Sequence, residues 1–117
     1  MTEVNQINDL IVELIDSELE VNDNLKTIKV SDRGCEIINE ICDYAEQTTI
    51  FQENKEKTEI FNGSSAYQVY GYMLNRIVSA PIFLYAQTSV LLIMPVVRQK
   101  LIAEGVMVKS EKESVNE

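Results

Sequence analysis

Two pairs of carboxylates stand at a spacing that could serve metal chemistry. Glu13 and Asp16 form one acid-x-x-acid pair, and Glu40 and Asp43 form another. Residues three apart lie on one face of a helix, so each pair would present both carboxylates together. Facing carboxylates from two helices can hold Mg²⁺ through oxygen ligands. Because the chain contains no His, carboxylate-and-metal chemistry is the enzymatic option that the composition leaves open.

The spacing of these pairs resembles the E-x-x-E…E-x-x-D arrangement of the all-α, MazG-like nucleotide pyrophosphatases. The resemblance covers residues 13–43, and the first pair ends in Asp where the pattern has Glu. It implies a Mg²⁺-dependent nucleotide hydrolase with Glu13, Asp16, Glu40 and Asp43 as metal ligands. We keep this as the alternative to a non-enzymatic interpretation, under which no cofactor or metal is expected.

The same carboxylates belong to two longer acidic rows at helical spacing. The first row is Asp9, Glu13, Asp16 and Glu20, and the second is Asp32, Glu36, Glu40 and Asp43. Like charges four residues apart on a helix cost a few tenths of a kcal/mol each, and neither row has an obvious compensating Lys. Rows of carboxylates on adjacent helices could imitate a phosphate backbone and occupy the basic groove of a partner protein. A solubilising face is the competing interpretation.

Net charge is distributed unevenly along the 117 residues. The formal charge is −9, yet residues 1–59 carry a net −10 and residues 60–117 a net +1. An acidic chain of this kind is a poor direct binder of nucleic acid. We expect one domain, 1–117, with an acidic helical half (1–59), an apolar half (60–108) and a frayed polar tail (109–117).

Apolar periodicity predicts a mainly α fold of about four helices with a small β component, mixed α+β being the alternative. The expected helices are 3–20, 32–48, 64–80 and 88–104, and the expected strand elements are 25–30, a hairpin over 49–61, and Val106–Val108. Gly105 is expected to end the last helix in a left-handed conformation. Two points stay open: whether 82–94 is helix or strand, and whether Pro95 kinks the last helix or begins it.

The second half is apolar enough to suggest contact with another surface. Its first helix is apolar on nearly every side, so we expect self-association as a homodimer or larger assembly. The predicted interface residues are Tyr70, Met73, Leu74, Ile77, Leu84 and Leu91. The uncharged run 77–97 could alternatively span a membrane, although Pro81 and Pro95 interrupt it.

Cysteine usage indicates a reducing compartment. Cys35 and Cys42 would lie two helical turns apart, about 10 Å by the helical rise, too far for a disulfide. We therefore expect a cytoplasmic protein, and the polar, acidic N-terminus shows no secretory signal. The predicted function is non-enzymatic protein binding, with inhibition of a nucleic-acid-binding partner as its most specific form.

Overall fold

The computed structural model describes residues 4–78 and 88–108, and its first helix is shorter than the periodicity predicts. Helix α1 spans Val4–Glu13, a π-helical turn η1 spans Leu14–Glu18, and strand β1 spans Leu19–Asn22. The apolar side of α1 and η1 is buried through Ile7, Ile11 and Leu14. The expected helix over 3–20 is therefore wrong beyond residue 18, because residues 19–22 pair with a second strand instead.

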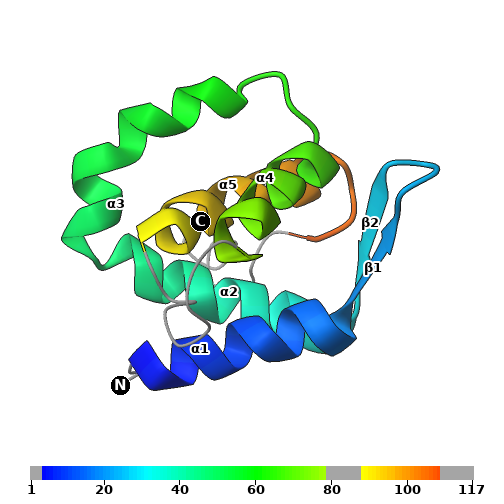
Figure 1. Cartoon of the computed structure of the whole chain (residues 1–117), viewed down its shortest axis with the longest axis horizontal. Helices are drawn as coiled ribbons and strands as arrows, with labels where there is room; N and C mark the ends of the chain where they lie inside the picture. Colours follow the sequence, from blue (N-terminus) through cyan, green and yellow to red (C-terminus); the bar gives the residue numbers. More distant parts are fainter. Residues whose placement is uncertain (1–3, 79–87, 109–117) are drawn as a thin grey trace, which may run out of the picture.

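A β-hairpin follows η1 and projects from the helices (Figure 1). Strand β1 is antiparallel to β2 (Thr27–Val30), with Leu19 opposite Val30 and Asn22 opposite Thr27. Asn22 Oδ1 accepts a hydrogen bond from the Leu25 backbone N–H at 2.9 Å, which stabilises the turn. The strand expected over 25–30 is confirmed from residue 27. Its partner was missed because strand pairing is a tertiary contact that helical periodicity does not report.

Helix α2 spans Asp32–Glu46 and lies against α1 and α5 (Figure 1). Ser31 caps it, since the Ser31 side chain accepts a hydrogen bond from the Gly34 N–H. Its apolar positions Ile37, Ile38 and Ile41 are fully or almost fully buried. This helix agrees closely with the range 32–48 expected from the sequence.

The hairpin expected over 49–61 is wrong, because this segment is helical. Helix α3 spans Thr49–Asn54, and a 3₁₀ helix, η2, spans Lys55–Phe61. The Thr48 hydroxyl caps α3 by accepting a hydrogen bond from the Phe51 N–H at 3.4 Å. No favoured hairpin turn lies between the expected strands. We call residues 49–61 the strap, because they arch beside α5 (Figure 1) with Phe61 as their one buried side chain.

Helices α4 (Ala66–Val78) and α5 (Thr88–Ala103) pack against each other and complete the core. Helix α5 is continuous through Pro95, so 88–94 is helical and Pro95 does not begin the helix. Gly105 has a φ of +78°, as expected for a left-handed helix end. The Val106 and Met107 N–H groups both donate to the Leu101 carbonyl. That closing turn replaces the strand expected at Val106–Val108.

The fold is mainly α with a small β component, as the sequence predicts. The described residues contain five α-helices, one more than expected, because the sequence predicts a hairpin where α3 lies. Two predicted segments lie outside the described residues: 82–87, which includes the predicted interface residue Leu84, and the tail 109–117. Within 4–78 and 88–108, no helix is long and apolar enough to cross a membrane.

Candidate functional site

The two acidic rows lie on neighbouring helices, but the first row is interrupted. Asp9 and Glu13 belong to α1 and Asp16 to η1, whereas Glu20 belongs to β1. Glu20 therefore leaves the predicted helical face, since the chain becomes extended at Leu19. The second row keeps its predicted placement on α2: Asp32, Glu36, Glu40 and Asp43 are all exposed.

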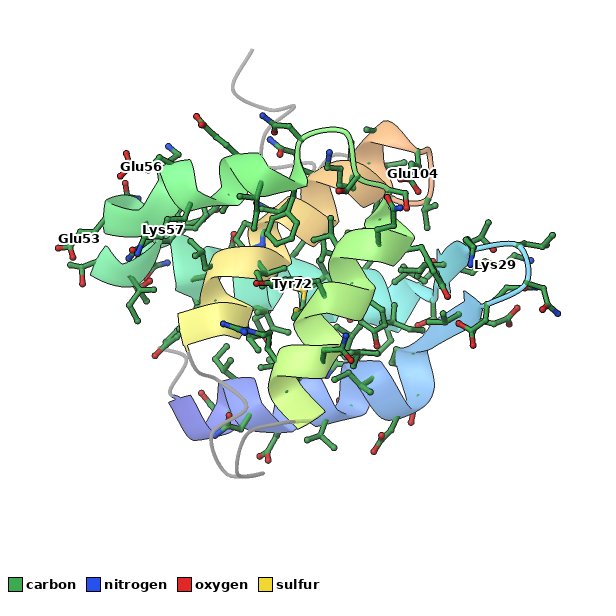
Figure 2. All side chains as sticks on the ribbon, turned by 45° about the horizontal axis from the view of Figure 1, so that its top comes forward. Lys29, Glu53, Glu56, Lys57, Tyr72 and Glu104 are labelled. Atoms are coloured by element: carbon green, nitrogen blue, oxygen red, sulfur yellow. The ribbon has the colours of Figure 1, made fainter. Side chains whose placement is uncertain are left out.

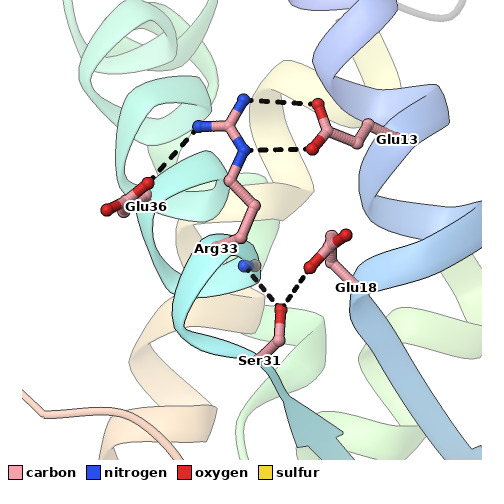
Figure 3. A network of polar contacts seen from close by, with 6 residues as sticks. Glu13, Glu18, Ser31, Arg33 and Glu36 are labelled. Carbon is pink, nitrogen blue, oxygen red and sulfur yellow. Dashed lines mark hydrogen bonds and ion pairs between the residues drawn. The ribbon is translucent and has the colours of Figure 1, made fainter.

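Arg33 of α2 holds the two helices together across this face (Figure 3). Its guanidinium donates to both Glu13 carboxylate oxygens, at 3.0 and 3.2 Å, and to Glu36 at 3.4 Å. The hydrogen bonds from Arg33 lower the pKa of Glu13, and the contacts with Glu13 raise the pKa of Arg33. The sequence pattern offers no Lys four residues away within either row. Arg33 instead stands three residues before Glu36 in α2, and its contact with Glu13 reaches from one helix to the other.

A second polar cluster fixes the point where the hairpin leads into α2 (Figure 3). The Ser31 hydroxyl donates to Glu18 Oε1 at 2.6 Å and accepts from the Gly34 N–H at 2.9 Å. The Ser31 N–H also donates to the Glu18 carbonyl at 3.1 Å. The contacts between Glu18 and Ser31 therefore help to position the acidic α1–α2 face, and Glu18 is not itself counted as part of that face.

An open pocket of about 280 Å³ joins the two acidic rows. Asp9, Glu13 and Glu40 line it, with Gln6 and Leu10 beside them. The predicted metal ligands Asp16 and Asp43 are not among these lining residues. In the described part of the chain, no group of three carboxylates or thiols is arranged to hold a metal ion. The Mg²⁺-dependent alternative stays a prediction, which nucleotide hydrolysis with and without Mg²⁺ would test.

Four predicted interface residues are covered by their own chain. Tyr70, Met73, Ile77 and Leu91 are at most 4% exposed, and Leu74 is partly buried against the same core. Burial raises the pKa of Tyr70 to about 12. The four buried side chains pack within the core of their own chain, whereas Leu74 keeps some exposed surface. Self-association itself stays a prediction.

A pocket of about 530 Å³, which no sequence pattern predicts, lies between the strap and α5. Arg98 of α5, whose side chain is 14% exposed, donates to Asn39 Oδ1 at 3.2 Å and to Glu46 Oε2 at 3.1 Å. Lys55 and Phe51 line the pocket from the strap. The Arg98 contacts link α5 to α2. The guanidinium is therefore already paired within the chain, where it stabilises the fold.

Neither cysteine is an activated nucleophile. Both Cys35 and Cys42 are free thiols. Burial raises the pKa of Cys42 to about 12 and also raises the pKa of Cys35. A raised pKa keeps the thiol protonated at neutral pH, and the protonated thiol is the unreactive form.

Comparison with known proteins finds no matching family model, no matching curated protein and no matching solved structure.

Proposed function

We propose that the chain is a non-enzymatic protein-binding module that docks its acidic α1–α2 face on a basic surface of a partner. By occupying a surface that would otherwise hold phosphates, it would inhibit nucleic-acid binding by that partner. The observation that carries the proposal is the exposure of carboxylates from both rows on two helices that pack side by side. Asp9 and Glu40 come from different helices and line one pocket between them.

Ion pairs within the chain neutralise only part of the acidic face, so most of its carboxylates can interact with a partner. Glu13 and Glu36 share the Arg33 guanidinium. Asp9, Asp16, Glu40 and Asp43 have no ion pair within the described residues. An excess of negative charge on a rigid two-helix surface favours fast association with a basic partner. Arg33 contributes by holding the two helices in a fixed relation.

Self-association and a cytoplasmic location belong to the same proposal. The two free thiols support a reducing compartment. Light scattering on the purified chain would measure its oligomeric state. A monomer at all accessible concentrations would remove the self-association part and leave the docking part intact.

The docking test compares two variants of equal charge. D9N/E36Q/E40Q neutralises three carboxylates of the acidic face, and E53Q/E56Q/E59Q neutralises three exposed carboxylates of the strap. Each immobilised chain is incubated with cell extract, and the protein retained by the wild type is purified. Its affinity for each variant is then measured, together with its nucleic-acid binding.

We expect the face variant to lose about tenfold in affinity or more, since three interfacial charges are removed. The strap variant should bind like the wild type, and wild-type binding should weaken with salt. Competition between the chain and nucleic acid for the partner is also expected. Equal affinities for the two variants would show that the acidic face is not the docking surface.

A further inference from the structure

A second surface, formed by the strap, α4 and α5, has the opposite chemistry to the acidic face. It is a groove of about 430 Å³ whose apolar lining includes Ile60, Phe61, Leu92 and Ile93. Ile60 is 70% exposed although it is large and apolar. Among the described residues, the groove therefore keeps accessible apolar surface, chiefly at Ile60, and such surface is typical of a binding site.

An aromatic pair, Phe61 of the strap and Tyr72 of α4, lines this groove. The Phe61 and Tyr72 rings meet edge to face with centroids 5.2 Å apart. The Arg76 guanidinium lies 5.6 Å from the centroid of the Tyr72 ring. Phe61 is buried and anchors the strap, while Tyr72 is 40% exposed. The aromatic pair holds Arg76 beside the apolar lining before any ligand arrives.

Two cations flank the apolar lining. Lys57 approaches from the strap and Arg76 from α4. Neither forms an ion pair with a carboxylate in the described part of the chain. Figure 2 shows Lys57 on the strap near Glu53 and Glu56, and Tyr72 on α4. Those two glutamates do not line the groove, and no acidic residue appears among its described lining residues.

We propose that this groove binds a small organic acid with an apolar body, such as a medium-chain fatty acid. The apolar chain would cover Ile60, Leu92 and Ile93, and the carboxylate would meet Lys57 and Arg76. The volume falls in the range of small-molecule sites, roughly 300–1,000 Å³, which combine apolar walls with few polar groups. The two local cations favour the acid over a neutral or cationic amphiphile, against the repulsion from the chain's net charge of −9.

The test uses matched amphiphiles on the full chain. Decanoate and decyltrimethylammonium have the same alkyl chain and opposite charge, and each is titrated below its micelle concentration. Methyl NMR resonances of Ile60, Leu92 and Ile93 report occupancy of the groove. We expect decanoate to shift these resonances saturably and the cation to bind much more weakly. Equal binding of the two amphiphiles, or no saturable shift with decanoate, would overturn the proposal.

Two variants of equal charge locate the carboxylate. K57Q/R76Q removes the groove cations, and K26Q/K29Q removes two exposed lysines from the hairpin. We expect K57Q/R76Q to weaken decanoate binding about three- to tenfold, as for exposed charge pairs, with K26Q/K29Q unchanged. A third variant, I60S, should weaken binding without unfolding the chain, because Ile60 is exposed. Equal decanoate affinity for K57Q/R76Q and the wild type would contradict the assigned site.

Discussion

Gly34 lies where α2 packs closely against the hairpin and η1. A Cβ atom placed on it would lie 2.6 Å from Val30 Cγ1 and 2.8 Å from the Glu18 carbonyl oxygen. The backbone of Gly34 is ordinary helix, so the requirement for glycine comes from space and not from torsion angles. Gly71, in the middle of α4, has no neighbouring atom within 4 Å of the same position.

Substituting alanine at these two glycines should change stability in opposite directions. Gly34→Ala should lower the free energy of unfolding by about 1–3 kcal/mol, since packed backbone must move. Gly71→Ala should raise it by about 0.5–1 kcal/mol, because alanine loses less entropy on forming a helix. Urea denaturation followed by circular dichroism measures both. Two changes of the same sign would contradict the close approach at Gly34.

The Glu13–Arg33 pair predicts a pH dependence of stability. The folded pKa of Glu13 lies below its ordinary value of 4.5. Its contribution is therefore present above the unfolded pKa and is lost as the pH falls through the folded pKa. The stability difference between wild type and Glu13→Gln should be largest at neutral pH and shrink in acid. Glu40→Gln is the control, since Glu40 forms no ion pair in the described structure. A difference independent of pH would show that Arg33 does not act through the Glu13 charge.

At the scale of elements, the strap buries far fewer side chains than helix α2. Helix α3 has no buried residue, and η2 buries Phe61 alone. Helix α2, by contrast, buries six residues. Local stability follows the apolar contacts that an element makes. The strap should therefore be less stable than α2.

Amide hydrogen exchange under native conditions should show this order. We expect amides of α3 and η2 to exchange by local opening, well before those of α2. Phe61→Ala should speed exchange across the whole strap, because its one buried anchor is removed. Uniform protection of the strap and α2 would mean that the strap unfolds only with the whole molecule.

At the scale of the whole molecule, the acidic and apolar halves share one core. Helix α5 packs against both α2 and α4, and Arg98 of the second half bonds to Asn39 and Glu46 of the first. Cys42 lies inside this core with no exposed surface. Its thiol can therefore serve as a reporter of global unfolding.

Alkylation of Cys42 should occur only through unfolding. In a Cys35→Ala chain, iodoacetamide should modify the one remaining thiol at a rate that rises with urea in parallel with the unfolded fraction. The raised pKa and the burial both suppress reaction in the folded state. Rapid alkylation in the absence of denaturant would show that the core opens locally at α2.

Local pattern was sufficient to predict α2, α4 and α5, but it was insufficient for α3, for the hairpin and for the surfaces that the elements form. Helix α2 and the left-handed Gly105 were predictable because capping residues and 3.6-residue periodicity act within a few positions. Strand β1 was not, since its hydrogen bonds come from β2, and Leu19–Asn22 continues an apparently helical pattern. The sequence does not predict the helices of the strap, because its few apolar residues show no clear helical period.

For the candidate sites too, local sequence pattern determined some features and tertiary packing determined the others. The sequence alone determined which residues carry the negative charge, that no His is present, and that α2 presents four carboxylates at helical spacing. Only the tertiary structure decided that Glu20 leaves the face, that Arg33 joins Glu13 to Glu36, and that Lys57 and Arg76 flank one groove. The physical reason is range: helix periodicity depends on neighbours within about four residues, whereas ion pairs and grooves depend on how elements pack.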